Sequence, residues 1–441
     1  MNVLFIAPYL PYPLSEGGRI SQFAVIDYFR KIHSVSVIVA AESEEDDANI
    51  SRLKTIWPDV KIITISLYVN IRAGIKDMAK KKIRQEIKRL KKIIKTLTGN
   101  NDDANTTDIL NSIDSNFANI VVLKKQQFIE KLSEIVHSLK IDVIQVDLIE
   151  YADLAYALPS NVKKILVHHE LRHARIASSF KENNQLHAYK KYLLSLVIDR
   201  ERQLLKLYDA IFVFSKDDKQ KLELELPDSD IYVTPFPVLD NNFIDIDDDS
   251  HTFNKLIFLG GEWHQPNKDA VEWYIEEIMP KVSEVCNLKL HVVGKWSDET
   301  INRCKKFDNI IFEGFVDDLI GFCRNGIMVV PVRVGSGIRT KILYSMAQGV
   351  PVVSATLGCE GIGVFHKREI MIADDALAFA NGIKELIDNK PLANSIIKNA
   401  QNLVKKNYSQ KVVCEQRSLF LESIVSKDKN TTIQNLQTDF K

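Results

Sequence analysis

Short, almost uninterrupted apolar runs alternate with longer amphipathic runs along most of this chain. Runs such as NVLFIA near the amino terminus and VPVVSA after Gly349 are rich in β-branched and aliphatic residues and carry no charge. Uniform hydrophobicity over so few residues is typical of strands that helices cover on both faces. The pattern therefore predicts βαβ units built around parallel sheets.

The apolar runs fall into two series, which predicts two domains. At 441 residues the chain exceeds the size at which a single hydrophobic core normally stops growing. Between the two series lies PFPVLDNNFIDIDDDSHTFN, in which prolines precede an acidic run, as expected of a linker. The predicted strands are NVLFIA, SVSVIVA, VKIITIS, DVIQVD, KKILVH and AIFVF in the first series, and KLIFLG, KLHVVG, NIIFEG, IMVVPV and VPVVSA in the second.

These series set the expected boundaries. We place the amino-terminal domain at 1–238 and the linker at 239–253. The carboxy-terminal domain follows at 254–408, and a closing helix with a polar tail occupies 409–441. The tail has the composition of a frayed terminus.

One segment breaks the alternation. Residues 71–97 hold eleven Lys or Arg and only two acidic residues, and their apolar residues recur at helical spacing. This predicts a basic amphipathic helix, within an insertion at about 71–120, of the kind that lies on anionic lipid. The alternative is a solvated helix that packs one stripe on its own domain.

Charge and cysteine content exclude several classes of protein. The chain carries 58 Lys or Arg and 58 Asp or Glu, so its formal net charge is zero, which argues against nucleic acid as a partner. The five cysteines include no C-x-x-C pair and indicate reduced thiols rather than disulfides or zinc ligands. The start, MNVLFIAPYLPYP, lacks the pattern of a signal peptide, and no window reaches about 18 apolar residues. We therefore expect a cytoplasmic protein.

Two parallel-sheet domains provide one expected place for chemistry, the cleft that faces the carboxyl ends of both sets of strands. The stretch APYLPYPLSEGGR follows the first predicted strand, and Gly17 and Gly18 open the next helix. Glycines at such a turn let backbone N–H groups approach a bound anion closely. The alternative is an ordinary strand-to-helix turn. The spacing differs from G-x-G-x-x-G and so disfavours a nicotinamide-dinucleotide site.

The strongest motif is GSGIRTK, between IMVVPV and VPVVSA. We expect the preceding strand to end near Val334 and a helix to begin around Gly337, with its free N–H groups directed into the cleft. Arg339 would offer a planar fork of donors and Lys341 a point charge, which together suit a diphosphate. Cations oppose the dipole at the start of a helix, so two of them here favour a bound anion over ordinary surface charges.

A third group, LVHHELRHAR, follows the fifth predicted strand. His168 and His169 would lie at the carboxyl end of this strand and face the cleft, with Glu170 and Arg172 adjacent. Neutral imidazole can hydrogen-bond a sugar hydroxyl or orient an acceptor hydroxyl. The alternative is a structural role for the histidines.

Two longer stretches resemble the carboxy-terminal domain of glycosyltransferase family 4, which has the GT-B fold. They are FLGGEWHQPNKDAVEWYIEEIMP and VVPVRVGSGIRTKILYSMAQGVPVVSATLGCEGI. The bacterial exopolysaccharide and cell-surface glycan branch is the nearer match, because it pairs a PN-x-DAV helix start with G-S-G-x-R-x-K-x-L. With P-x-P-x-x-x-GG-R and the histidine strand end, the resemblance covers most of the chain. It implies an α/β protein whose two Rossmann-like domains face each other across a cleft.

The resemblance also implies an activity, the transfer of a sugar from a nucleotide-diphospho-sugar to a hydroxyl, usually with retention of anomeric configuration. No metal and no other cofactor is expected, because basic side chains and a helix N-terminus neutralise the leaving diphosphate. The acceptor would be a glycan or a lipid-linked glycan. Arg339 and Lys341 would hold the diphosphate, and His168 or His169 would contact the reacting sugar, which makes these four the candidate catalytic residues.

The donor-binding residues are carried over in the same way. In the wider family a Lys follows the G-G turn that here ends at Gly261, and Asn267 occupies roughly that place with Lys268 beside it. The candidate donor-binding residues are Gly17, Gly18, Gly261, Asn267, Lys268, Gly335, Ser336, Gly337, Tyr344 and Glu360.

The chain departs from the family at one important place. Many members carry two glutamates separated by seven residues, and the second grips the ribose of the donor. Here Ser336 and Tyr344 stand at these positions. Tyr344 offers one hydroxyl, and Glu360 in LGCEGI would be a substitute acceptor; the alternative is a weakened donor site.

Three hypotheses therefore stand. The leading one is an active glycosyltransferase in the biosynthesis of a surface polysaccharide or glycan. The departure at Tyr344 motivates the second, a GT-B-shaped nucleotide-sugar-binding partner that has weak or no transfer activity. The third is a GT-B sugar-nucleotide epimerase, which needs no acceptor. In each case the expected location is the cytoplasm, and the lipid hypothesis for 71–97 adds peripheral contact with the inner face of the cell membrane.

Overall fold

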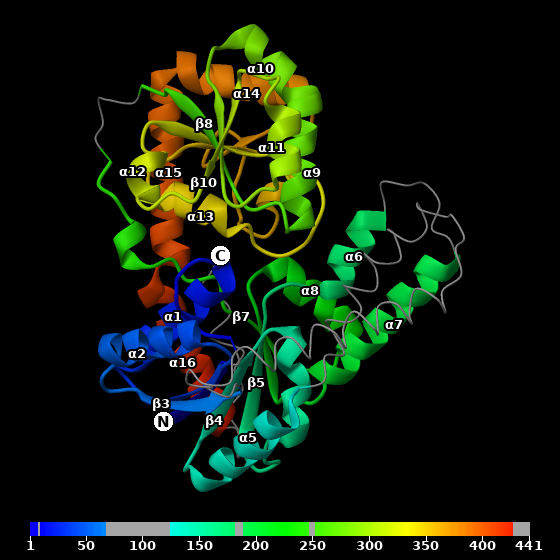
Figure 1. Cartoon of the computed structure of the whole chain (residues 1–441), viewed down its shortest axis with the longest axis vertical. Coiled ribbons are helices and arrows are strands. Elements are labelled where there is room, and N and C mark those ends of the chain that lie inside the picture. The colour runs from blue at the N-terminus through cyan, green and yellow to red at the C-terminus, as the bar shows by residue number, and fades with distance from the viewer. Residues whose placement is uncertain (8, 68–123, 181–187, 247–251, 427–441) are drawn as a thin grey trace, which may run out of the picture.

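The protein contains two parallel sheets, each covered by helices, in separate lobes (Figure 1). The computed structural model describes residues 1–7, 9–67, 124–180, 188–246 and 252–426. The strand orders are β3-β2-β1-β4-β5-β6-β7 and β10-β9-β8-β11-β12-β13. This confirms the α/β fold of two Rossmann-like domains predicted from the sequence. The basic segment 71–97 and the rest of the insertion to residue 120 lie outside the described residues.

The amino-terminal lobe is built around β1, where Leu4, Phe5, Ile6 and Ala7 are completely buried. Its seven strands are β1 (Asn2–Ala7), β2 (Ser34–Ala41), β3 (Lys61–Ser66), β4 (Val143–Asp147), β5 (Lys163–His168), β6 (Ala210–Val213) and β7 (Ile231–Val233). Its helical elements are α1 (Gly17–Phe29), α2 (Glu44–Ile56), α5 (Gln126–Ser138), η1 (Ile149–Ala157), α6 (Arg172–Phe180), α7 (Ala188–Leu205), α8 (Lys216–Glu225) and η2 (Asp240–Asn242).

The carboxy-terminal lobe repeats the βα alternation. Its strands are β8 (Lys255–Leu259), β9 (Leu290–Val293), β10 (Ile310–Gly314), β11 (Gly326–Val330), β12 (Val352–Ser354) and β13 (Met371–Ile372). Its helical elements are α9 (Gln265–Trp273), η3 (Tyr274–Ile278), α10 (Met279–Val285), α11 (Asp298–Cys304), α12 (Leu319–Cys323), α13 (Thr340–Ala347), η4 (Leu357–Cys359), α14 (Ala376–Asp388) and α15 (Lys390–Tyr408).

The chain crosses between the lobes twice, at one place. Backbone hydrogen bonds join Val238 to Tyr408 (N···O 2.7 Å) and Gln410 to Val238 (2.9 Å), so the outgoing and returning segments run side by side. Helix α16 (Gln410–Ser426) then packs on α1 of the first lobe, and the Gln410 side chain donates to the carbonyl of Ala24 (2.8 Å). The predicted closing helix therefore belongs structurally to the amino-terminal lobe.

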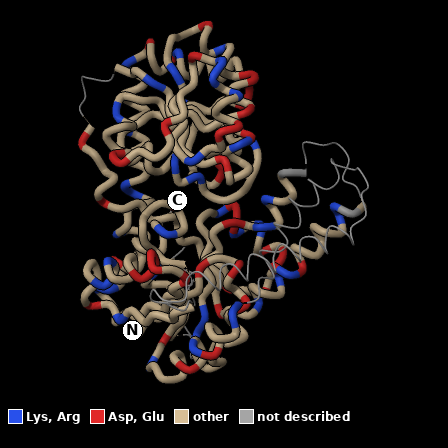
Figure 2. The backbone as a smooth tube through the Cα atoms, in the orientation of Figure 1, with Lys and Arg blue, Asp and Glu red and all other residues tan. Residues whose placement is uncertain are grey.

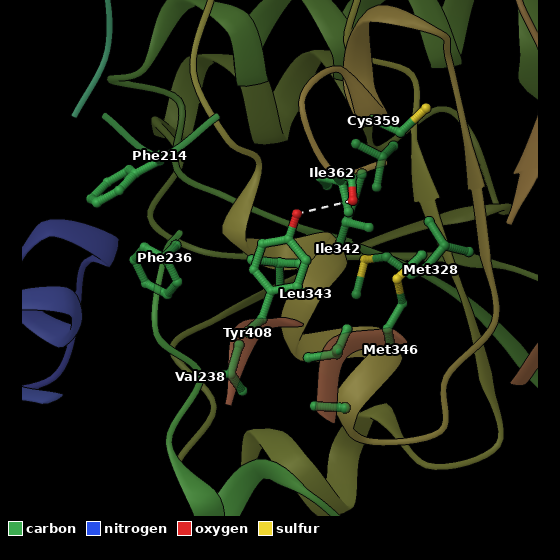
Figure 3. Packing of buried hydrophobic residues seen from close by; sticks show 14 of the residues in the cluster. Phe214, Phe236, Val238, Met328, Ile342, Leu343, Met346, Cys359, Ile362 and Tyr408 are labelled. Carbon is green, nitrogen blue, oxygen red and sulfur yellow. Dashed lines mark hydrogen bonds between the residues drawn. The ribbon is translucent and has the colours of Figure 1, made fainter. Parts of the chain in front are cut away.

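Helix α13 is anchored firmly in the second lobe (Figure 3). Ile342, Leu343 and Met346 on one side of it are completely buried. Burial of each such side chain contributes roughly 1.5–3 kcal/mol. This packing fixes the direction of α13, and with it the position of its first turn at the edge of the lobe.

Charges of both signs are intermixed on the described parts of the two lobes. Figure 2 shows Lys and Arg beside Asp and Glu on each of them. Among the described helices, none combines the length and the apolar character that crossing a membrane requires.

Candidate functional site

The loop between β11 and α13 carries the GSGIR motif, and its bounds differ from those that the sequence suggested. β11 ends at Val330, not near Val334, and α13 begins at Thr340, not around Gly337. Gly337 has φ +77°, a left-handed conformation that interrupts a right-handed helix. The correction places Arg339 at the N-cap of α13.

Arg339 is a buried cation with an unused donor. The residue is 9% exposed, and its Nη1 donates to the carbonyl of Gly337, while Nη2 has no hydrogen-bond partner among the described residues. Burial lowers the pKa of Arg339, and Glu170 is the nearby charge that opposes this shift most. A buried donor without a partner costs about 1–3 kcal/mol, which a bound anion would recover.

Lys341 lies in the first turn of α13 and is tied to the turn after β8. Its Nζ donates to Oδ1 of Asn267 (2.9 Å) and lies 4.1 Å from the centroid of the Phe258 ring. Burial, and then the charge of Arg339, lower the pKa of Lys341 to about 7. Asn267 in turn donates from Nδ2 to the carbonyl of Gly261 (3.1 Å). The structure thus brings together Lys341, Asn267 and Gly261, three of the candidate site residues.

The Gly260–Gly261 turn accepts Asn267 only because position 260 is glycine. A Cβ at Gly260 would lie 2.4 Å from Nδ2 of Asn267, closer than real Cβ atoms approach. Lys268 follows in the first turn of α9, where its N–H donates to the carbonyl of His264 (3.3 Å). Within the described part of the chain its side chain forms no ion pair.

The start of α1 meets the start of α13 from the opposite lobe. A Cβ at Gly17 would lie 3.3 Å from Cγ2 of Thr340, and one at Gly18 would lie 3.7 Å from the His169 ring. Neither helix receives a hydrogen bond from the side chain of its N-cap residue, Glu16 or Arg339. Two uncapped N-termini, each the positive end of a helix dipole, converge here and create an anion-binding environment.

His169 borders this place and is held by a buried carboxylate. Its Nε2 lies 3.2 Å from Oδ1 of Asp147, which is 1% exposed at the end of β4. Gln22 and Gln145 donate to the other oxygen of Asp147 at 3.2 and 2.9 Å. An Nε2–H donated to Asp147 leaves Nδ1 of His169 as an acceptor on the side of Gly18. Asp147 closes the predicted strand DVIQVD, but no sequence pattern indicates that it meets His169.

His168 does not face the cleft, so this expectation is wrong. Its Nε2 lies 2.7 Å from Oε1 of Glu201 on α7, and both residues are at most 2% exposed. Successive residues of a strand point to opposite faces, so only one of the two histidines reaches the cleft. Glu201 also receives the N–H groups of Arg172 (3.0 Å) and His173 (3.1 Å), so it caps α6.

His173 completes this buried network. Its Nδ1 lies 2.6 Å from Glu201 and its Nε2 lies 3.0 Å from Glu225. Burial alone would lower the pKa of His173, but the hydrogen bonds with the two carboxylates raise it to about 9. The network joins β5, α6, α7 and α8 and fixes the loop that carries His169.

The GSG loop is docked on α6. The N–H of Gly335 donates to Oγ of Ser178 (2.9 Å), and Oγ of Ser336 donates to the carbonyl of Leu171 (3.1 Å). A Cβ at Gly337 would lie 3.1 Å from Cβ of Glu170. Gly335, Ser336 and Gly337 therefore contact the first lobe directly, and the carboxyl ends of the two sheets face each other in contact.

Tyr344 and Glu360 reach the same boundary. The Tyr344 hydroxyl is buried and has no hydrogen-bond partner in the described ranges, and its ring meets that of Phe236 edge-on at 6.0 Å. Burial raises the pKa of Tyr344. Glu360 accepts from Nζ of Lys221 on α8 (3.1 Å), so in this structure it bridges the lobes.

The basic side chains of the site also affect His264, a residue that the sequence analysis did not single out. His264 lies at the N-cap of α9. Burial, followed by the charges of Lys341, Arg175 and Arg339, lowers its pKa to about 4. His264 is therefore neutral at neutral pH beside three basic side chains. No cluster of three or more His, Cys, Asp or Glu suited to a metal ion occurs in the part of the chain that is described.

Two facing parallel-sheet lobes with cations at their contact are the arrangement of GT-B proteins. Residues 254–389 match the family model for glycosyl transferases group 1, so the carboxy-terminal domain carries the sequence pattern of that family. This confirms the resemblance predicted from the sequence. The carboxy-terminal domain is thus similar in sequence to the group 1 glycosyl transferases.

One relative in sequence and two solved structures illustrate what the chain is similar to. A Klebsiella pneumoniae "uncharacterized 44.6 kDa protein in cps region" is 23% identical, over 96% of this chain and 100% of its own length. Sucrose-phosphate synthase from Thermosynechococcus elongatus matches with a TM-score of 0.64 at 12% identity, over 96% of this chain and 99% of that one. HepE from Anabaena, solved with UDP-glucose, matches with a TM-score of 0.61 at 12% identity, over 96% and 100%.

Proposed function

We propose that this protein transfers a sugar from a nucleotide-diphospho-sugar to a hydroxyl of a glycan or lipid-linked glycan, in the biosynthesis of a surface polysaccharide. The observation that carries the proposal is Arg339 at the meeting point of two uncapped helix N-termini, a buried guanidinium with one donor that no described residue accepts from. Such a site is built for a compact, multiply charged anion.

The geometry supports a mechanism in which charge stabilisation does most of the work. As the bond between sugar and diphosphate breaks, negative charge grows on the leaving phosphate, and Arg339, Lys341 and the N–H groups of α1 and α13 stabilise it. These cations serve in place of a metal ion. His169, oriented by Asp147, accepts a hydrogen bond from a hydroxyl of the transferred sugar. We expect retention of anomeric configuration, as in the family that the sequence resembles.

The comparisons supply the first donors and acceptors to try. The neighbour HepE was solved with UDP-glucose, and the Klebsiella relative is encoded in a cps region. Uridine diphosphate is therefore the first nucleotide to test, and a polysaccharide precursor is the first acceptor. A cytoplasmic location, with the basic segment 71–97 on the inner face of the membrane, belongs to the same proposal.

The proposal is tested by nucleotide release. A thermal-shift screen against nucleoside diphosphates first identifies the base, because a ligand of the folded state raises Tm. The release of that diphosphate from its sugars is then measured for the wild type and for Arg339→Ala. Loss of about 2–4 kcal/mol of transition-state stabilisation predicts that the rate of diphosphate release falls roughly 30- to 1,000-fold.

Arg303→Ala is the matched control, because Arg303 pairs with Glu272 at the surface of the same lobe (3.0 Å). Equal turnover of wild type and Arg339→Ala would refute the assignment.

A second candidate, a nucleotide-sugar-binding protein without transfer, is favoured by one observation. Tyr344 stands where many members have a ribose-binding glutamate; its hydroxyl is buried without a hydrogen-bond partner among the described residues, and its ring packs edge-on against Phe236. Calorimetry followed by an assay of nucleotide release separates the two, since a pure binder gives heat of binding and no diphosphate. Product analysis without acceptor detects an epimerase.

A further inference from the structure

One face of α6 lies along the GSG loop of the other lobe. Leu171, just before α6, accepts the hydrogen bond of Ser336 (3.1 Å), and Ser178 accepts that of Gly335 (2.9 Å). Positions 171, 175 and 178 are separated by four and three residues, so they share one side of the helix. Arg175 lies between the two contacts, and its charge is among those that lower the pKa of His264 in the other lobe, so the side chain lies near that lobe.

Arg175 is paired with the carboxylate next to that loop. Its Nη1 lies 3.1 Å from Oε1 of Glu170, and both side chains are mostly buried, at 20% and 25% exposure. The Cβ of Glu170 packs on Gly337, whose carbonyl accepts from Arg339. Glu170 thus stands between an arginine of the first lobe and the buried arginine of the second.

Electrostatic effects agree with this placement. Burial lowers the pKa of Arg339, and among the charges that oppose the shift Glu170 acts most strongly, ahead of Glu360 and Asp218. Those two carboxylates have other partners, since Glu360 pairs with Lys221 (3.1 Å) and Asp218 accepts from Ser215 at the start of α8 (2.7 Å). Glu170 is therefore the main counter-charge of Arg339 and the ion-pair partner of Arg175.

We infer that Arg175 is a third cation of the diphosphate site, contributed across the cleft by the amino-terminal lobe, and that Glu170 is a place-holding counter-ion which a bound diphosphate displaces. The inference rests on the proposed function and adds to it a residue of the other lobe. A diphosphate would accept a hydrogen bond from Nη2 of Arg339, which has no partner in the described part of the chain, and would take over Arg175 from Glu170. Glu170 then opposes binding, while Arg175 favours it. The two partners of one ion pair should have opposite effects.

Calorimetric titration of the full chain with inorganic pyrophosphate tests this. Arg175→Gln should weaken binding about tenfold or more, because a charge-assisted hydrogen bond is lost. Glu170→Gln, which keeps the shape of the side chain, should tighten binding several-fold. Arg303→Gln and Glu272→Gln alter an Arg–Glu pair of similar distance (3.0 Å) away from the cleft and should bind like the wild type.

The outcomes separate the inference from the proposed function. If Arg339→Ala loses pyrophosphate binding while Arg175→Gln and Glu170→Gln both bind like the wild type, the inference is overturned and the proposed function stands. Weaker binding by Glu170→Gln also overturns it, because Glu170 then supports the site. If Arg339→Ala binds as tightly as the wild type, the proposed function itself fails. Should Arg175→Gln melt at a clearly lower temperature, Arg175→Lys, which keeps the charge, must bind more tightly than Arg175→Ala.

Discussion

Lys341 gives the site a specific pH dependence. Burial and the neighbouring Arg339 lower the pKa of Lys341 to about 7 in the free protein. At pH 8 only about one tenth of Lys341 is then protonated. A bound diphosphate favours the ammonium form and raises this pKa, so binding above pH 7 must take up a proton. The affinity for pyrophosphate should therefore fall by up to about tenfold for each pH unit above 7.

The assay is calorimetry between pH 6 and pH 9 in two buffers of different ionisation enthalpy, which counts the protons taken up on binding. Pyrophosphate also titrates in this range, so the control is Lys341→Met, which retains the ligand's own titration but lacks that of Lys341. The wild type should take up more protons at pH 8 than the variant does. Identical pH slopes for the two proteins would refute the reasoning.

The lowered pKa of Lys341 also predicts how the free energy of unfolding changes with pH. In the unfolded chain Lys341 has the ordinary lysine pKa of 10.5, so between about pH 7 and 10.5 the unfolded chain binds more protons than the folded one. Stability should therefore rise with pH across this window, while the cost of the buried charge is present in full below pH 7. The difference of 10.5 − 7 = 3.5 pH units corresponds to at most about 5 kcal/mol. In denaturant unfolding, Lys341→Met should be more stable than the wild type at pH 6, and this difference in the free energy of unfolding should disappear towards pH 10.

Other substitutions test the surroundings of the site. Gly337→Ala should lower the free energy of unfolding by about 1–3 kcal/mol, because its left-handed φ is strained and its Cβ would press on Glu170; Gly363→Ala, with similar φ (+73°) and open space, controls for strain alone. Glu201→Gln should cost about 3–5 kcal/mol in urea unfolding, since it leaves a buried histidinium partly unpaired; an unchanged midpoint would contradict the network. Tyr344→Phe should leave Tm nearly unchanged, and if the hydroxyl serves the ribose, it should weaken binding of the nucleoside diphosphate but not of pyrophosphate.

The fold was predictable because it depends on local periodicity. Most strands of the two sheets are short and have an apolar centre, and the strand ends place Gly17, His169 and the GSG loop at one edge by topology alone. The cations of GSGIRTK were found for a physical reason, their conflict with the dipole of the helix that follows. The basic segment 71–97 lies outside the described residues, and its lipid contact stays a prediction.

The wrong predictions have a different physical reason. The helix α13 begins at Thr340 and not at the predicted Gly337, because the sequence does not show that Gly337 adopts a left-handed conformation. His168 and His169 could not be told apart without knowing which face of β5 packs on α7. The carboxylates that hold them, Asp147 and Glu201, lie 22 and 33 residues away, and only the folded structure brings each pair together. Long-range polar pairs of this kind leave no periodic pattern.

The most direct test of the central claim is a structure of the protein with the nucleoside diphosphate that raises its Tm most. We predict the terminal phosphate at the meeting point of α1 and α13, within hydrogen-bond distance of Nη2 of Arg339 and of Nζ of Lys341. A diphosphate bound elsewhere, with Nη2 of Arg339 still lacking a partner, would contradict the account.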